Sequence, residues 1–336
     1  MFVGNGNGKQ KGGRKTMNGN FLSKAKAVVV GHAVGDALGV PVEFSKREEL
    51  DKNPVVDMRA YGTFRMPKGA FSDDTSMSLC ALDVLGGDKI NFDRVMENFG
   101  KWYYEGAFTP TGETFDVGNT CSFAIENYFF GKKSWRECGM KGERDNGNGS
   151  LMRIHPFALH AYRLNTDEKT KIRIVELASS LTHAHERALI GCGIYSFLLW
   201  ELLDRPCLES IVSGLKTAEA YYRNRAESEK YRRVFSFANL ETVRRVERED
   251  IRSSGYIVDS LEAAVWCLLT TSSYLSCVLK AVNLGGDTDS VAAIAGGLAG
   301  ALYGYERIPR EWRESLLKRE EIEALCAAAF AENGKE

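Results

Sequence analysis

The chain has 336 residues, of which 44% are hydrophobic and 26% charged, and its formal net charge is −1. This composition is typical of a globular protein, and the near-neutral balance argues against nucleic-acid binding, which usually requires a clear basic excess. Its eight cysteines include no C-x-x-C pair. The sequence therefore argues against a zinc ribbon or a disulfide framework and favours a reducing cytoplasm.

Residues 1–20 are rich in Gly, Asn, Lys and Arg and contain almost nothing that a core could bury. We expect them to form a disordered lead-in to one domain that spans residues 21–332. No apolar signal region is apparent. No stretch reaches the roughly 18–20 uncharged apolar residues of a membrane span, and the longest candidate is Val291–Tyr303. The sequence therefore predicts no membrane partner.

The rest of the chain has helical periodicity nearly throughout, and alternating strand patterns are scarce, which predicts an all-α fold. In chain order, helices are expected within residues 27–39, 74–85, 185–203, 255–282 and 308–330. The last of these ranges reads as one or two helices with a charged, solvated face. Residues 221–254 are charged and weakly periodic, so they could form either a surface excursion or a lid.

Val291–Tyr303 has small residues on every side, including Gly296, Gly297 and Gly300. Each glycine costs about 1 kcal/mol relative to alanine inside a helix, and that cost is explained if neighbouring helices approach closely. The pattern predicts a central helix whose N-terminal end carries Asp287 and Asp289.

Two acidic motifs open predicted helices, and each combines two aspartates with hydroxyl side chains. The first contains Ser72, Asp73 and Asp74, and the second contains Asp287, Asp289 and Ser290. Helix capping is the simple interpretation of either motif alone, but one cap needs only one carboxylate. Four carboxylates with adjacent hydroxyls match the hard oxygen ligands of Mg²⁺, Ca²⁺ or Mn²⁺. If the motifs meet in space, a pair of divalent ions about 3.5–4 Å apart would offset their charge.

Two further acidic residues lie near the first helix. Asp36 is inside its apolar stretch, and Glu43 follows Pro41 just beyond it. A glutamate after such a loop is usually solvated. The neighbours Val42 and Phe44 favour a half-buried setting instead, in which the pKa of Glu43 would rise toward the range of a general base.

Five stretches in this order resemble the ADP-ribosylglycohydrolase family, particularly its bacterial dinitrogenase reductase-activating members. They are GDALGVPVEF, FSDDTSMS, FDVGNT, DNGNGSLMRIHPFAL and GGDTDSVAAIAGGLAGALYG. The resemblance implies a compact, single-domain orthogonal helical bundle with two Mg²⁺ or Mn²⁺ ions at the base of a cleft. The metal ligands that it implies are Ser72, Asp73, Asp74, Asp287, Asp289 and Ser290.

The resemblance also assigns catalytic roles, to Glu43 near the metals and to Asp116 at the substrate ribose. Two positions depart from the family pattern. Asn119 stands where the bacterial relatives have a further Asp, and Ser290 replaces the commoner Thr. Serine retains the oxygen, so the metal site is expected to survive, whereas Asn119 puts the nearby substrate contacts in doubt.

The Asn/Gly-rich stretch DNGNGSLMR reads alone as a plain turn, but the resemblance makes it the lining of a diphosphate. Gly147 and Gly149 permit left-handed or closely approaching backbone, and Ser150 adds a hydroxyl, as anion-binding loops require. Arg153 could contact phosphate or brace the loop. His183 matches a histidine on the adenosine side, and Tyr256 borders the ligand, although each could be a core residue. The full substrate-binding set is Gly118, Asn146, Gly147, Asn148, Gly149, Ser150, Arg153, His183 and Tyr256.

The resemblance thus implies a binuclear-metal hydrolase that removes ADP-ribose from protein side chains, with the arginine linkage favoured, by cleaving the C1″ glycosidic bond. Two alternatives remain: a catalytically inactive ADP-ribose-binding or structural relative, and a binuclear phosphoesterase. The expected partner is an ADP-ribosylated protein or a small molecule containing ADP-ribose, and a monomer is expected.

Overall fold

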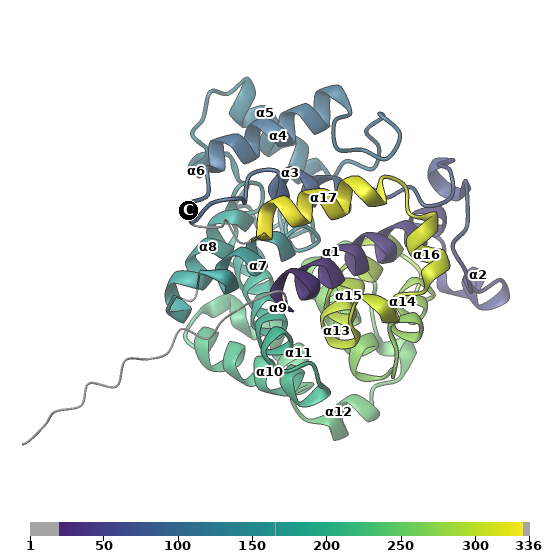
Figure 1. Ribbon diagram of the computed structural model, residues 1–336. Helices are drawn as coiled ribbons and strands as arrows, with labels where there is room; N and C mark the ends of the chain where they lie inside the picture. The colour runs from purple at the N-terminus through teal and green to yellow at the C-terminus, as the bar shows by residue number, and fades with distance from the viewer. Residues whose placement is uncertain (1–19, 165, 332–336) are drawn as a thin grey trace, which may run out of the picture.

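The computed structural model describes residues 20–164 and 166–331, and helices joined by loops make up these residues (Figure 1). The α-helices are α1 Asn20–Gly39, α2 Arg47–Lys52, α3 Asp73–Leu82, α4 Phe92–Glu105, α5 Asn119–Phe129, α6 Trp135–Cys138, α7 His155–Arg163, α8 Glu168–Ser180, α9 Glu186–Asp204, α10 Leu208–Tyr222, α11 Arg232–Ser236, α12 Leu240–Arg244, α13 Ile257–Leu269, α14 Tyr274–Val282, α15 Thr288–Tyr303, α16 Arg310–Ser315 and α17 Arg319–Phe330. Short 3₁₀ helices lie at Val40–Val42, Gly62–Phe64, Ala226–Tyr231, Arg248–Asp250 and Tyr305–Arg307.

The described residues form no β-strand, only isolated bridges, so the all-α prediction is confirmed. The lead-in predicted at residues 1–20 lies outside the described residues, apart from Asn20 at the start of α1. The domain limits 21–332 stay a prediction.

Helices α1 and α15 form the centre of the fold and pack against each other along their length (Figure 1). The glycines of α15 allow this approach. A Cβ atom on Gly296 would lie 2.3 Å from the carbonyl oxygen of Gly31, and one on Gly300 would lie 2.1 Å from that of Ala27. Alanine cannot fit at such distances without a shift of the α1 backbone. The prediction of a central, closely packed helix is confirmed.

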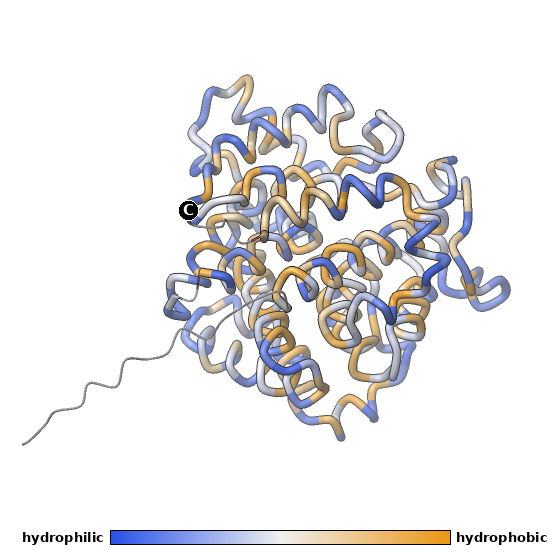
Figure 2. Tube along the Cα trace, in the orientation of Figure 1, coloured by the Kyte–Doolittle hydropathy of each residue, from blue (hydrophilic) through white to orange (hydrophobic). Residues whose placement is uncertain are grey.

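The first helix and its following turn, Phe21–Val42, are long and apolar enough to match a membrane span by length and composition. This segment is longer than Val291–Tyr303, so the expectation that Val291–Tyr303 is the longest candidate is wrong. However, 89% of its most apolar window is buried inside the protein. That burial is typical of a core helix, and Figure 2 shows orange, hydrophobic stretches along the helices in the middle of the molecule.

Two ranges with helical periodicity each form two helices in the structure, and for residues 308–330 this is one of the two outcomes that the sequence allows. Residues 255–282 form α13 and α14, because Ser273 starts α14 with a capping box in which it exchanges hydrogen bonds with Ser276. Residues 308–330 form α16 and α17, and the break at Lys318 has a left-handed backbone (φ 56°). The capping hydroxyl of Ser273 and the left-handed backbone of Lys318 thus separate two helices in each range, although the apolar pattern continues across the break.

Residues 221–254 are an anchored surface excursion rather than a free lid. Tyr231, Phe237 and Ile251 from this segment are buried in the core. The guanidinium of Arg47 also donates hydrogen bonds to the carbonyl oxygens of Arg248 (2.7 Å), Ile251 (2.6 Å) and Leu284 (2.8 Å). One side chain therefore ties the excursion to the loop that precedes α15.

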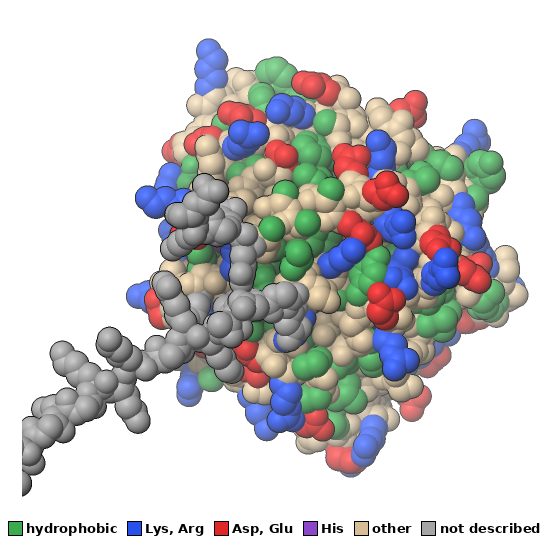
Figure 3. Space-filling view, in the orientation of Figure 1, with side chains coloured by type: hydrophobic (Ala, Val, Ile, Leu, Met, Phe, Trp, Pro, Cys, Tyr) green, Lys and Arg blue, Asp and Glu red, His purple; other side chains and the backbone are tan. Residues whose placement is uncertain are grey.

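The surface carries both signs of charge. On the face drawn in Figure 3, Lys and Arg side chains lie interspersed with Asp and Glu. This distribution matches the near-neutral net charge of the sequence.

Candidate active site: a buried carboxylate cluster

The two acidic motifs lie side by side at the N-terminal ends of α3 and α15. Ser290 Oγ donates a hydrogen bond to Asp74 Oδ1 at 3.1 Å, although 216 residues separate them in the sequence. Asp73, Asp74 and Asp289 are buried. The structure therefore brings together the residues whose convergence the metal hypothesis requires.

Capping does not account for these carboxylates. At α3 the cap is Ser72, whose Oγ accepts a hydrogen bond from the backbone N–H of Asp74 at 3.3 Å. At α15 the cap position is Asp287, and its side chain makes no capping hydrogen bond. Asp289 uses one oxygen, Oδ1, to accept from the N–H of Ser290 at 2.9 Å. Most of the carboxylate oxygens thus remain for another partner.

Asp36 holds the first motif in place from α1. Its Oδ1 accepts from the N–H of Ser72 at 2.9 Å, and its Oδ2 accepts from Thr75 through both the N–H (3.0 Å) and the hydroxyl (2.6 Å). Burial raises the pKa of Asp36 to about 6, although the hydrogen bonds from Thr75 and Ser72 act in the opposite direction. In the sequence, the only signal of this role is a charged residue inside an apolar helix.

Glu43 and Asp116 complete the cluster from two loops. Oxygen atoms of Glu43, Asp116 and Asp289 all lie within 4.8 Å of one another. Glu43 is only 4% exposed, so the prediction of a half-buried side chain understated its burial. Burial and the negative charges of Asp116 and Asp287 raise the pKa of Glu43 to about 11, above the range expected for a general base at neutral pH.

The other carboxylates experience the same environment. Burial is the main cause that raises the pKa values of Asp73, Asp74, Asp287 and Asp289, and for Asp73, Asp74 and Asp289 the acidic neighbours raise them further. Among the described residues, no donor reaches Glu43 Oε2, Asp74 Oδ2 or Asp289 Oδ2, all of which are buried. Buried anionic oxygens without donors are costly unless a cation binds them. The donor set consists entirely of oxygen atoms and therefore fits Mg²⁺ or Mn²⁺.

The predicted diphosphate loop joins this cluster through Asn148. The side-chain amide of Asn148 donates to Asp287 Oδ2 and to Ser260 Oγ, each at 2.9 Å. Its backbone N–H donates to the carbonyl oxygen of Gly255, and Ile257 N–H donates to that of Asn146. The loop thus lies against the start of α13 and beside the carboxylates.

The two loop glycines serve a different purpose from the left-handed backbone that the sequence suggested. Neither Gly147 nor Gly149 has a positive φ. A Cβ on Gly149 would lie 2.9 Å from Cε1 of His183 and 3.0 Å from Sγ of Cys121, so the lack of a side chain permits close approach. Left-handed backbone is therefore wrong for both glycines, and close packing holds for Gly149, whereas a Cβ on Gly147 would make only ordinary contacts at 3.6 Å.

Ser150 and Arg153 face the protein interior. Ser150 Oγ accepts from Ser179 at 2.9 Å, and Arg153 donates to Thr182 Oγ1 at 2.7 Å and to the carbonyl oxygen of Ala178 at 3.3 Å. Both side chains are completely buried. This placement supports the bracing role for Arg153 and argues against direct contact of either side chain with a diphosphate.

The remaining predicted substrate residues surround the same region. His183 is buried beside Gly149, and burial lowers its pKa to about 3, so the ring is neutral. Tyr256 is half-buried at the cap of α13, with its ring 5.7 Å from the guanidinium carbon of Arg187. Gly118 caps α5, and a Cβ there would meet open space, while Asn119 is exposed at the first helical position.

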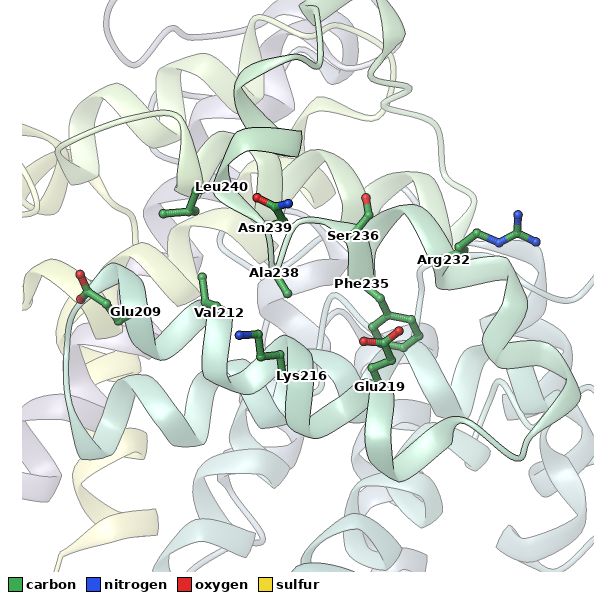
Figure 4. A pocket seen from close by; sticks show the side chains of 10 residues that line it. All are labelled: Glu209, Val212, Lys216, Glu219, Arg232, Phe235, Ser236, Ala238, Asn239 and Leu240. Atoms are coloured by element: carbon green, nitrogen blue, oxygen red, sulfur yellow. The ribbon is translucent and has the colours of Figure 1, made fainter.

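A groove of about 690 Å³ lies elsewhere, between α10 and the segment that contains α11 and the start of α12 (Figure 4). Its walls include Val212, Lys216, Phe235 and Leu240. None of the predicted site residues lines this groove. The carboxylate cluster is therefore the candidate active site.

The all-α fold and the buried carboxylate cluster at two helix starts fit a hydrolase, and comparison with known proteins identifies the family. The chain matches the ADP-ribosylglycohydrolase family over residues 17–336 and belongs to that family. It is 34% identical over 310 residues to "ADP-ribosylarginine hydrolase Tri1" of Serratia proteamaculans, covering 92% of this chain and 79% of the relative.

Two further relatives support the assignment. The chain is 29% identical to "ADP-ribosyl-[dinitrogen reductase] glycohydrolase" of Rhodospirillum rubrum, covering 91% of this chain and 96% of that protein. The solved structure titled "ADP-ribosylglycohydrolase-related protein complex" superposes with a TM-score of 0.76 at 30% identity and covers 92% of this chain and 98% of its own. The family assignment made from the five stretches is confirmed, as is the class of enzyme, a glycosidase-type hydrolase.

Proposed function

We propose that the chain removes ADP-ribose from modified arginine side chains by using two divalent cations. The observation that carries this proposal is the hydrogen bond between Ser290 and Asp74, which joins two acidic motifs from opposite ends of the chain. The buried oxygens of Glu43, Asp74 and Asp289 that lack donors among the described residues support a cation there.

Six residues would hold the cations. They are Ser72, Asp73 and Asp74 from the start of α3, and Asp287, Asp289 and Ser290 from the start of α15. Bound Mg²⁺ or Mn²⁺ would polarise the ribose hydroxyls and lower the pKa of a coordinated water. Asp36 would fix the α3 ligands through its hydrogen bonds to Ser72 and Thr75, as supporting residues do around metal sites.

Glu43 and Asp116 would carry out the proton transfer and orient the ribose. Water attacks C1″, a new C1″–O bond forms, and the bond from C1″ to the arginine nitrogen breaks. The positive charge of bound cations would lower the pKa of Glu43 from its raised value, so that Glu43 would be a carboxylate. Glu43 would then accept the proton that the water loses and pass it to the departing nitrogen, and the arginine would leave unmodified. Asp116 lies close enough to Glu43 to hydrogen-bond with it and would hold the ribose hydroxyls during the oxocarbenium-like transition state.

The arginine linkage is favoured because the relatives from Serratia proteamaculans and Pseudomonas putida, each 34% identical, are both named ADP-ribosylarginine hydrolase. The carboxylate cluster itself recognises only the ADP-ribose half of the substrate. Asn148 and its loop would place the diphosphate at a distance from the bond that breaks, which supplies binding energy for positioning C1″.

The test is a panel of arginine-, serine- and O-acetyl-linked ADP-ribose substrates incubated with Mg²⁺ or Mn²⁺, with free ADP-ribose measured. We expect release from the arginine-linked substrate. Glu43→Gln should slow turnover and leave ADP-ribose binding intact. A protein that binds ADP-ribose but releases none from any linkage would instead be a binding-only relative, and cleavage within the diphosphate would indicate a phosphoesterase.

A further inference from the structure

Three aromatic side chains form a continuous group beside the carboxylate cluster. The ring centroids of Phe44 and Phe64 lie 6.4 Å apart, and those of Phe64 and Phe115 lie 5.1 Å apart. Phe44 and Phe115 lie in loops, and Phe64 ends the short 3₁₀ helix Gly62–Phe64. We refer to Phe44, Phe64 and Phe115 together as the aromatic rim.

The rim is attached directly to the proposed catalytic residues. Phe44 follows Glu43 and Phe115 precedes Asp116, and oxygens of these two acids lie within 4.8 Å of each other and of Asp289. Phe64 is held near Glu43 through its neighbour Thr63, whose Oγ1 donates a hydrogen bond to the carbonyl oxygen of Glu43 at 2.8 Å.

Exposure places the rim on the solvent side of the cluster. Glu43 is 4% exposed, whereas Phe44 is 66% exposed, and Phe64 and Phe115 are half-buried. The diphosphate loop contacts the cluster elsewhere, through Asn148 and Asp287. The loop and the rim thus adjoin the cluster through different residues, so a ligand with its diphosphate on the loop and C1″ at the carboxylates would leave the rim free for its leaving group.

The protein maintains Phe44 in an unfavourable conformation. Its φ is +63°, a value that a non-glycine residue with a bulky side chain rarely adopts. Hydrogen bonds from Phe44 N–H to the Gly286 carbonyl (2.7 Å) and from Gly286 N–H to the Ser45 carbonyl (2.9 Å) hold it there. Because the ring is mostly exposed, core packing does not explain why this position has a phenylalanine instead of a glycine.

We infer that the aromatic rim is the binding site for the guanidinium of the modified arginine, and so selects the linkage. This inference rests on the proposed function. A guanidinium is a planar cation that stacks on aromatic faces, and the acidic cluster beside the rim also attracts positive charge. A serine side chain is neutral and short, and it offers the rings no comparable contact.

The test compares rim variants with the wild-type chain on arginine-linked and O-acetyl-linked ADP-ribose. Phe44→Gly removes the ring and relieves the positive φ, so its melting temperature should equal or exceed that of the wild type. Phe64→Leu removes a ring face, and Phe64→Tyr preserves it. Phe130→Leu is the matched control, because Phe130 is a 73% exposed phenylalanine outside the rim.

We expect Phe44→Gly and Phe64→Leu each to lower kcat/KM for the arginine-linked substrate about three- to fivefold, as the loss of an exposed cation–π contact predicts. Phe64→Tyr, which keeps an aromatic face, should lose less than Phe64→Leu, and the control Phe130→Leu should retain the wild-type value. Affinity for free ADP-ribose, measured by calorimetry, should not change in any variant, and inhibition by agmatine should weaken in the two ring-deletion variants.

Three results would overturn the inference: equal losses on both linkages, reduced ADP-ribose affinity, or unchanged agmatine inhibition. These outcomes are distinct from failure of the proposed function. If the proposed function is wrong, the wild-type chain will release no ADP-ribose from arginine. If only the rim inference is wrong, the wild type will be active and the variants will keep its linkage preference.

Discussion

The helix starts that present the carboxylates and the loops that surround them are built in contrasting ways. Asp74 and Asp289 lie in the first turns of buried helices, and Ser290 donates a hydrogen bond to each of them. Asp36 fixes the start of α3 by accepting hydrogen bonds from Ser72 and Thr75. In the loops, by contrast, the backbone is strained. Of the seven described non-glycine residues with positive φ, five lie between residues 44 and 116: Phe44, Tyr61, Arg65, Phe108 and Asp116.

The difference indicates a division of labour. Ligands for a cation must be held within fractions of an ångström, and packed helices provide that rigidity. Groups that meet a variable substrate are presented on loops, where backbone strain is tolerated because the surrounding contacts enforce it. Changes in the helix starts should therefore abolish the chemistry, as should changes of Glu43 or Asp116, whereas changes of the other residues in these loops should alter which substrate is used.

The largest effect is expected for Asp289→Ala. Loss of a ligand that shapes the cation site should lower kcat/KM for ADP-ribose release by about a thousandfold, since a bound metal contributes several kcal/mol to the transition state. Asp93→Ala is the matched control, because Asp93 also occupies the second residue of a helix but is exposed. Similar losses in both variants would show that the Asp289 carboxylate only stabilises the N-terminus of its helix and does not bind a cation.

Gly296→Ala tests the close packing of α15 against α1, which holds the helix starts rigidly. The new Cβ would lie 2.3 Å from the carbonyl oxygen of Gly31, so α1 and α15 must separate, and we expect a loss of about 1–3 kcal/mol of stability. Thermal unfolding measures this change. Gly87→Ala should leave the melting temperature nearly unchanged, because its new methyl group would have no neighbouring atom within 4 Å. An unaffected Gly296→Ala variant would refute the close packing of the two helices.

Asn148→Ala should have an intermediate effect. It removes the hydrogen bond to Asp287 Oδ2 that orients this carboxylate, and loss of such a supporting partner lowers metal affinity by about tenfold or more. Titration with Mn²⁺ measures the affinity. Asn239→Ala, which changes only the cap of the distant α12, serves as the control. Unchanged Mn²⁺ affinity in Asn148→Ala would separate the diphosphate loop from the cation site.

The smallest effect is a pH dependence of cation-induced stabilisation. The pKa values of Asp74, Asp287 and Asp289 are raised in the folded, cation-free chain above the ordinary value of about 3.9, mainly by burial. The folded state therefore binds more protons than the unfolded state, and its stability falls as pH rises above that value. Cations replace those protons, so the rise in melting temperature on adding Mg²⁺ should be larger at pH 8 than at pH 5. An increase that is larger at pH 5 would contradict this account.

The sequence predicted much of the fold and the site because the relevant signals are local. Apolar periodicity identified the main helices, and the glycines of α15 indicated close packing. The composition of the two acidic motifs indicated a shared cation site on the condition that the motifs meet in space, and the sequence left that condition open.

Other features depend on contacts between segments that are far apart in the chain, and local sequence patterns do not show which segments will meet. The three carbonyls bound by Arg47 come from residues about 200 or more positions away. The inward orientation of Ser150 and Arg153 is decided by partners on α8 and in the turn that follows it. Asp36 was visible as an anomaly in an apolar helix, but its partners Ser72 and Thr75 were not.

The central claim, that the two acidic helix starts form one cation site, is tested most directly by counting bound Mn²⁺ and locating it by anomalous scattering. The account predicts two ions per chain between Asp74 and Asp289, and loss of at least one ion in Asp289→Ala. A wild-type chain that binds no Mn²⁺ there, yet releases ADP-ribose from arginine in the presence of EDTA, would contradict it.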